Sequence, residues 1–204
     1  MHLRRRPGRH ILIMLFFSSL IWLAGALVSS GVDPEARFPY WEVRDGSVSI
    51  RLVQRLPDQT RGFFQARGFR PAEAEVIAQS CVFQTTFRNT SGQSTPVTIE
   101  YNLREWTIHH DGRRGRLKTR EDWKQQWQAG GIARPAQLAF EWALLPTRQQ
   151  YRPGDYNWGM SVFNLKPGTQ FDLDVIWYRN GHREVVRIKA IRCAADVTME
   201  PTDQ

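Results

Sequence analysis

Apolar and polar residues alternate along much of the chain, in short stretches bounded by Gly, Pro, Asn and Asp. A period of two is typical of strands that have one buried face and one exposed face. The dipeptide Asn180-Gly181 adds a hairpin signal between the last two stretches. The pattern predicts about seven strands, at 48–52, 81–88, 97–103, 138–144, 156–162, 171–177 and 184–193.

Two stretches between the predicted strands have helical patterns instead. The first insertion lies at 57–79, where Pro71 opens a run of good helix formers. The second lies at 120–128, and Thr119 and Asp122 before and within it have the spacing of a capping box. These residues therefore predict two short helical insertions in a chain that is otherwise built from strands.

This order of elements is typical of a mainly β protein, and we predict an immunoglobulin-like antiparallel β-sandwich over 47–195. The segment 31–46 contains prolines and aromatic residues, and we interpret it as a connector. The polar segment 196–204 is predicted to be a flexible tail. At 138–144 a helix is a real alternative to the strand, because Ala and Leu also favour helices.

An uncharged run of 18 residues at 11–28 follows a basic segment at 1–10 that holds four arginines and no acid. This length is at the short end for a transmembrane helix, and the Ala-Gly-Ala sequence at 24–26 resembles a signal-peptidase site. Two alternatives stay open for 11–30: a retained single-pass signal anchor, placed first, or a cleaved signal peptide. In both, segment 1–10 stays in the cytoplasm and the body is expected in the periplasm, across a bacterial-type inner membrane.

The charge of the chain adds little to the predicted fold and location. The formal net charge is +8, and half of it comes from the four arginines before the apolar run. The remaining chain has 24 basic and 20 acidic residues. Such a small excess does not indicate a nucleic-acid-binding protein, and we predict no nucleic-acid partner.

The chain has two cysteines, Cys81 and Cys193, and both lie in the part that we expect to be translocated. An oxidising compartment favours a disulfide, and each cysteine falls on the apolar face of a predicted strand. We therefore predict a structural disulfide and no cofactor. The alternative is copper handling, in which the two thiolates, His109 and Met160 would supply the ligands.

Aromatic residues supply the first candidates for partner binding. Trp123 and Trp127 have i, i+4 spacing, so they form one stripe on the predicted helix. That stripe either docks the helix on the sandwich or forms a binding hot spot. Tyr156 and Trp158 follow a Pro-Gly-Asp turn and are predicted to lie at a rim of the sandwich, where they could contact a partner.

Arg113, Arg114 and Arg116 form the densest basic stretch of the translocated part. A solvent-exposed loop is one interpretation of this stretch. The other is a surface for an acidic partner or for anionic lipid headgroups.

The sequence contains none of the motifs that mark serine hydrolases, zinc hydrolases, phosphate-binding loops, dinucleotide-binding folds or c-type haem proteins. We therefore expect a non-enzymatic, membrane-tethered periplasmic accessory or assembly protein that binds a membrane complex or a periplasmic partner. Copper handling is the first alternative, and a cell-wall saccharide-binding module is the second.

Overall fold

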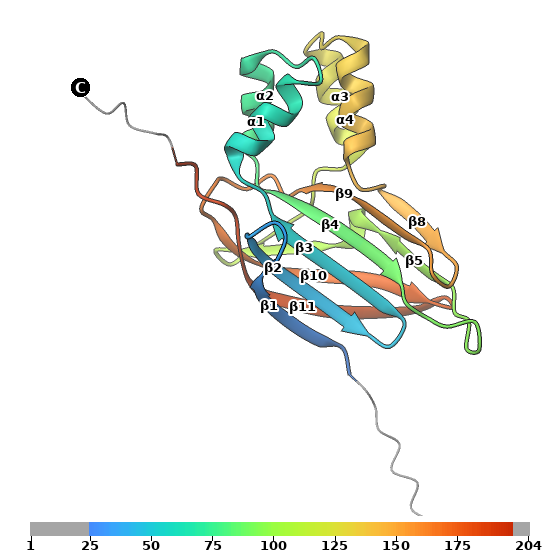
Figure 1. The fold of residues 1–204 in the computed structure, drawn as a ribbon. Helices are drawn as coiled ribbons and strands as arrows, with labels where there is room; N and C mark the ends of the chain where they lie inside the picture. The colour runs from blue at the N-terminus through green and yellow to red at the C-terminus, as the bar shows by residue number, and fades with distance from the viewer. Residues whose placement is uncertain (1–24, 198–204) are drawn as a thin grey trace, which may run out of the picture.

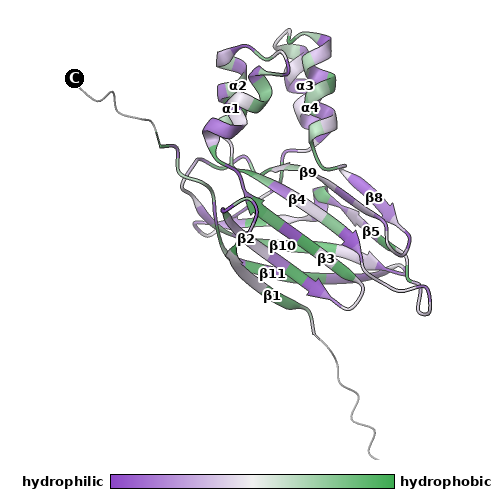
Figure 2. Ribbon diagram, in the orientation of Figure 1, coloured by the Kyte–Doolittle hydropathy of each residue, from purple (hydrophilic) through white to green (hydrophobic). Residues whose placement is uncertain are grey.

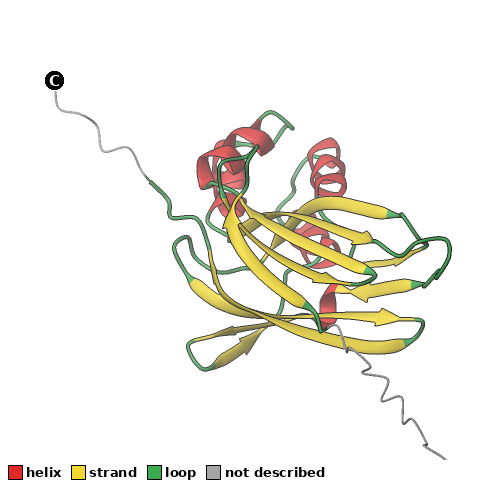
Figure 3. Ribbon diagram, turned by 60° about the horizontal axis from the view of Figure 1, so that its bottom comes forward, coloured by secondary structure: helices red, strands yellow, loops and turns green. Residues whose placement is uncertain are grey.

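The computed structural model describes residues 25–197 and shows a mainly β protein (Figure 1). Within these residues there are two antiparallel sheets with eleven strands in total, and four short helices. The two sheets form separate layers that face each other (Figure 3), which agrees with the predicted β-sandwich. None of the helices in this range is long and apolar enough to span a bilayer.

The first sheet has five strands in the order β1-β2-β3-β4-β9. Their bounds are β1 Leu27–Val32, β2 Pro39–Asp45, β3 Val48–Gln54, β4 Val82–Asn89 and β9 Tyr156–Val162. The outermost strands, β1 and β9, therefore come from distant parts of the chain. All four pairings between neighbours are antiparallel.

The second sheet has six strands, and its centre is the long strand β10. One edge of β10 pairs with β11 along its whole length, and the other edge pairs with β5 and β6, which continue to β8 and β7. A short 3-10 helix, Leu103–Glu105, separates β5 from β6. The bounds are β5 Ile99–Asn102, β6 Thr107–His110, β7 Arg113–Gly115, β8 Arg148–Tyr151, β10 Gln170–Arg179 and β11 His182–Arg192.

The larger core lies between the two sheets. Apolar and polar residues alternate along β3 and β4 (Figure 2), and Phe83 and Phe87 of β4 are fully buried, as the alternation predicts. The ring of Phe87 stacks on Tyr151 of β8, with 5.3 Å between the ring centroids. Trp106 is also fully buried, and its indole Nε1 donates a hydrogen bond to the carbonyl of Ile176 at 2.9 Å. Large rings of this kind bury much apolar surface and dominate the stability of a core.

A second, smaller core lies on the outer face of the first sheet, under the helices. The helices are α1 Pro57–Gln65, α2 Pro71–Ala78, α3 Arg120–Ala129 and α4 Arg134–Ala143, and they form two pairs above one end of the sandwich (Figure 1). Their apolar faces meet one another and the sheet. The buried members of this core are Phe64, Phe69, Ala74, Ile77, Val82, Trp123, Trp127, Ile132, Ala136, Phe140, Leu144, Met160 and Val162.

Local signals explain two helix boundaries. The backbone N–H of Phe69 donates to the carbonyl of Phe64 at 3.2 Å, and Gly68 between them has φ +88°, so α1 ends in a left-handed turn that suits glycine. The Asp122 carboxylate accepts the backbone N–H of Thr119 at 2.8 Å, which confirms the predicted capping interaction at the start of α3.

The predicted strand at 138–144 is wrong, because these residues belong to α4 and its C-terminal end. In the helix, Phe140 and Leu144 face the smaller core, whereas Trp142 is 82% exposed. Apolar residues at every second position fit a strand, but Phe140 and Leu144 are also four residues apart, which is the repeat of a helix face. The second helical insertion therefore contains two helices instead of one.

The predicted connector at 31–46 is also wrong, because β1 and β2 occupy most of it. Trp41 and Val43 of β2 are buried in the larger core, so Pro39, Tyr40 and Trp41 belong to a strand. The last residues of the predicted membrane segment, from Leu27 on, are part of β1 as well. The rest of that segment, at 11–24, and segment 1–10 lie outside the described residues, as does the tail beyond residue 197.

The strand register defines two ends of the sandwich. Leu27, where β1 begins, pairs with Arg44 beside the β2–β3 turn, and we call this the entry end. β3 runs from the entry end to α1, so the helices stand at the opposite end, which we call the helix end (Figure 1). Arg179 and Asp45 form an ion pair at the entry end with 2.5 Å between Nη2 and Oδ2.

Candidate aromatic surface on the first sheet

The outer face of the first sheet is covered by helices only at the helix end. On β9, Met160 lies under the helices and is 4% exposed, whereas Trp158, two residues earlier on the same face, is 67% exposed. Tyr156, a further two residues toward the entry end, is 52% exposed. Soluble proteins seldom leave adjacent large aromatic side chains uncovered without a binding role.

Arg88 completes this uncovered region. It pairs with Tyr156 across the β4–β9 ladder, and its guanidinium carbon lies 4.6 Å from the centroid of the Tyr156 ring. No carboxylate within residues 25–197 forms an ion pair with Arg88. We call Arg88, Tyr156 and Trp158 the aromatic surface. It combines an unpaired cation with two exposed aromatic rings.

The edge of β9 that faces away from β4 is hydrogen-bonded at the helix end and open at the entry end. Toward the helix end, the Leu145 N–H donates to the Met160 carbonyl at 2.9 Å, and the Lys118 N–H donates to the Val162 carbonyl at 3.1 Å. In the part of the chain that the structure describes, no loop or helix backbone forms such a bond with Tyr156 or Trp158. The strand edge beside the aromatic surface is therefore open to an additional strand.

The end of α4 lies close to this region. Leu144, which follows α4, forms a parallel bridge with Met160 of β9. Trp142 is two residues before Leu144, and Trp158 is two residues before Met160. The highly exposed Trp142 was assigned to a strand in the sequence prediction, so its exposure was missed. Arg88 was missed because nothing in the sequence distinguishes it from other strand arginines.

Trp123 and Trp127 are not part of any surface. Both are at most 3% exposed, and their rings stack with 4.8 Å between centroids. Phe140 of α4 packs against both rings. Of the two interpretations of this stripe, the structure therefore bears out the one in which the tryptophans dock the helix.

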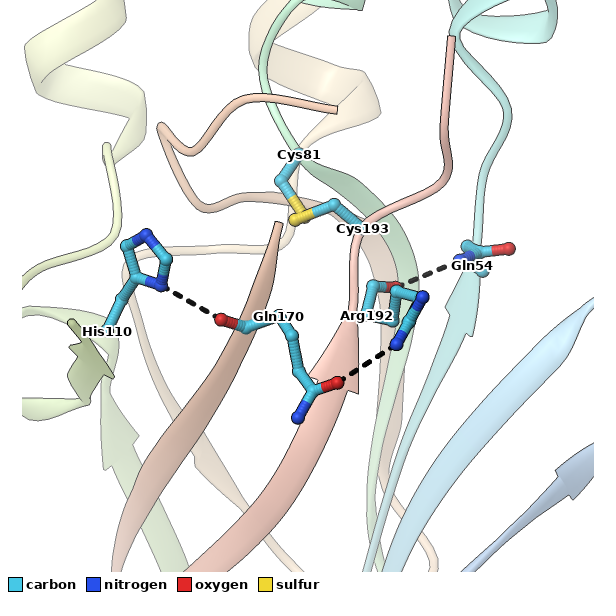
Figure 4. Close-up of a disulfide and its surroundings, with 6 residues drawn as sticks. All are labelled: Gln54, Cys81, His110, Gln170, Arg192 and Cys193. Carbon is cyan, nitrogen blue, oxygen red and sulfur yellow. Dashed lines mark hydrogen bonds between the residues drawn. A yellow bond between two sulfur atoms is a disulfide. The ribbon is translucent and has the colours of Figure 1, made fainter. Parts of the chain in front are cut away.

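The predicted disulfide between Cys81 and Cys193 is confirmed (Figure 4). It joins the residue before β4 in the first sheet to the residue after β11 in the second sheet, with 5.2 Å between the Cα atoms. Close by, Gln54 Nε2 donates to the Arg192 carbonyl at 2.9 Å, so a second contact ties the sheets at the helix end.

The residues proposed as copper ligands do not come together. Both sulfurs are used in the disulfide, and Met160 lies in the smaller core under the helices. His109 Nε2 instead contacts Asp174 Oδ2 at 2.7 Å on the outer side of the second sheet. Hydrogen bonds from Arg187 and then from His109 lower the pKa of Asp174. Among residues 25–197, no group of three or more His, Cys, Asp or Glu side chains is arranged to hold a metal ion.

Arg113, Arg114 and Arg116 are exposed on and after β7, at the outer edge of the second sheet. The neighbouring His110 donates a hydrogen bond from Nδ1 to the carbonyl of Gln170, 2.9 Å away, near the disulfide (Figure 4). This basic group therefore lies at the helix end, opposite the end where β1 begins.

The chain matches no family model, and searches of curated proteins and of solved structures found no similar protein. Only the residues of the site and their geometry therefore bear on function.

Proposed function

We propose that this protein is a non-enzymatic, extracytoplasmic accessory protein that binds a protein partner through the aromatic surface. The observation that carries this proposal is the exposure of Tyr156 and Trp158 beside an unpaired Arg88. Tyr, Trp and Arg are the residues most enriched at the hot spots of protein–protein interfaces. The immunoglobulin-like character suggested by the turn spacing stays a prediction, and the proposal does not depend on it.

The open strand edge supports a protein partner over other ligands. An extended segment of a partner could pair with the backbone at Tyr156 and Trp158 while its side chains contact the two rings. The closed edge at Met160 and Val162 would stop such pairing from extending under the helices. The partner segment is therefore expected to be short.

The position of β1 bears on how the protein is held at the membrane. β1 uses Leu27 and Val28, so only 16 uncharged residues, at 11–26, are left for a membrane helix. This is shorter than the roughly 17–25 residues that a spanning helix needs. The Ala-Gly-Ala sequence at 24–26 directly precedes β1. We therefore favour cleavage after Ala26, which makes Leu27 the first residue of the mature protein.

The intact mass of the protein isolated from cells distinguishes these alternatives. A mass that begins at Leu27 supports cleavage. A mass that includes the basic segment 1–10, recovered with the membrane fraction, supports the retained anchor instead. In both cases the aromatic surface is at the entry end, on the side where the chain leaves the membrane-targeting segment.

Quantitative co-purification tests the partner proposal. We expect a defined protein to be recovered with the wild-type chain and depleted at least about tenfold with a Tyr156→Ser/Trp158→Ser variant. Val185→Ser, which removes an exposed apolar residue of β11, is the matched control and should retain the partner. Equal recovery with all three chains would contradict the proposal.

A saccharide ligand is a second candidate function, favoured by one specific observation. Tyr156 and Trp158 are two positions apart on one strand face, so their Cα atoms are about 7 Å apart and both exposed rings could stack on neighbouring sugar units. Co-sedimentation with purified peptidoglycan that is lost in the same double variant would favour this candidate. No co-sedimentation of the wild-type chain would eliminate it.

A further inference from the structure

A groove of about 870 Å³ lies at the helix end of the first sheet, away from the aromatic surface. Val53 and Gln84, which pair across β3 and β4, form its floor. One wall is the loop between β1 and β2, at residues 33–38, and the other wall is the face of α1 that bears Gly62 and Phe63. Its size and its mixture of apolar and polar residues are typical of small-molecule sites.

Two hydrogen-bond donors of the groove are buried without a partner. Arg55 Nε and Gln84 Nε2 have no hydrogen-bond partner within the described residues. Arg55 continues β3, where its backbone N–H donates to the carbonyl of Val82 at 3.1 Å. Arg55 and Gln84 are therefore diagonal neighbours on the sheet, with Cβ atoms about 7 Å apart. A single acceptor group placed between them could satisfy both donors.

The groove also has an uncompensated positive charge. Burial and the nearby Arg67 lower the pKa of Arg55, and no carboxylate within residues 25–197 forms an ion pair with it. The two guanidinium groups lie over the Phe63 ring, with 5.0 Å from Arg55 and 3.3 Å from Arg67 to the ring centroid. An anionic ligand would remove the unfavourable burial of this charge.

Two acids line the opposite wall, Asp33 and Glu35, and neither forms an ion pair with Arg55. Asp33 Oδ2 accepts a hydrogen bond from Arg51 at 2.7 Å, and Oδ1 accepts the backbone N–H groups of Glu35 and Ala36 at 3.1 and 2.9 Å. The backbone hydrogen bond from Ala36 and the bond from Arg51 lower the pKa of Asp33. Three hydrogen bonds therefore hold the Asp33 carboxylate in the loop.

Gly62 gives independent support for a ligand. It lies inside the nine-residue helix α1, where glycine is less favourable than alanine. A Cβ atom at this position would meet no heavy atom within 4 Å, so packing within the protein does not require glycine. The glycine instead leaves the wall of the groove open to close approach by another molecule.

We propose that the groove binds a small-molecule carboxylate with an apolar body. The carboxylate accepts hydrogen bonds from Arg55 Nε and Gln84 Nε2, and the apolar body lies between Phe38, Val53 and Phe63. This site is independent of the proposed partner surface, because it is at the opposite end of the sheet and shares no residue with it. Either proposal can fail without affecting the other.

Isothermal titration of the full chain with 4-phenylbutyrate and with its neutral amide tests the proposal. The two probes share an aromatic body and differ only in the carboxylate. We expect one saturable site for the acid, with the amide at least about tenfold weaker. Equal affinity of the two probes, or no saturable binding of the acid at millimolar concentration, would overturn the proposal.

Matched variants assign the binding to the groove. Gly62→Leu should abolish binding of both probes by filling the wall, and Gly62→Ala, the matched control, should retain it. Arg55→Gln should weaken the acid at least about tenfold and leave the amide unchanged, whereas Arg152→Gln on an exposed loop should change neither. The circular dichroism of each variant reports its folding. Binding that survives in a folded Gly62→Leu variant would place the site elsewhere.

Discussion

The two halves of β9 have the same kind of sequence and opposite environments. Met160 and Val162, at the helix end, are buried under four helices, whereas Tyr156 and Trp158, at the entry end, are exposed on the same face of the strand. The difference comes from what covers the sheet, because the strand itself is continuous. Apolar residues on one strand face can therefore serve as core or as binding surface, and only the tertiary structure separates the two.

The largest expected effect concerns the covered end. The Cys81–Cys193 disulfide closes a loop of 112 residues, and in the chain-entropy model its removal lowers the free energy of unfolding by about 5 kcal/mol. A Cys81→Ala/Cys193→Ala variant should show this loss in chemical denaturation followed by fluorescence. A loss below about 1 kcal/mol would mean that the helix end is held by its cores alone.

A pair of single substitutions compares the two halves of β9 directly. Met160→Ala should lower the free energy of unfolding by about 2–5 kcal/mol, because it leaves a cavity in the smaller core. Trp158→Ala removes an exposed side chain and should change it by less than about 1 kcal/mol. Urea denaturation measures both values. Similar losses for the two variants would contradict the difference in burial.

Gly159 marks the boundary between the two halves. A Cβ atom there would lie 2.5 Å from the backbone nitrogen of Leu145, so the segment after α4 could not stay beside β9. Gly159→Ala should lower the free energy of unfolding by about 1–3 kcal/mol. It should also increase hydrogen exchange at the Leu145 N–H, which donates to Met160. Unchanged exchange at Leu145 would show that this contact is not maintained in solution.

Acid is expected to loosen the helix end slightly. Arg61 of α1 pairs with Glu75 of α2 and with Asp196, at 2.6 Å each, and these bonds lower the pKa of both acids below their ordinary values of 4.5 and 3.8. Because both pKa values are lowered on folding, the stabilisation is complete above the ordinary values and is lost as the pH falls through the lower folded ones. The groups are partly solvated, so each pair contributes less than about 1 kcal/mol.

Hydrogen exchange between pH 5 and pH 3 checks this expectation. Amides of α1 and α2 should lose protection before those at the entry end of β2 and β3. Asp196→Asn removes one of the two titrating groups and should reduce the difference. Uniform loss of protection across the protein would show that these ion pairs do not set the acid response.

The sequence predicted the sheets better than the regions around them. The alternation at 81–88 identified Cys81, Phe83 and Phe87 as inward residues and led to the predicted disulfide. This stretch contains few residues that favour helices, so its period of two indicated a strand. The residues of α4 fit both periods, so the pattern alone did not decide between helix and strand. The sequence prediction missed five of the eleven described strands. β6, β7 and β8 have only three or four residues each, too few to show an alternation, and an uncharged apolar run and a proline-containing segment conceal the alternation of β1 and β2.

The sequence predicted the candidate sites only in part. Tyr156 and Trp158 could be named as rim residues because they follow a turn, but their exposure depends on helices that cover only the other half of β9. The groove could not be predicted, since Arg55, Gln84 and the loop at 33–38 meet only through the fold. Gly62 is a local signal that could have marked this wall, because glycine is unfavourable inside a helix.

Site-specific photo-crosslinking in living cells tests the central claim most directly. A photoreactive phenylalanine analogue placed at Trp158 of the full chain should yield one dominant cross-linked protein, and the same analogue at Val185, exposed on β11, should not. That result would identify the partner and place it on the aromatic surface. No cross-linked protein from position 158, or the same products from both positions, would contradict the claim that the uncovered half of the first sheet is a binding surface.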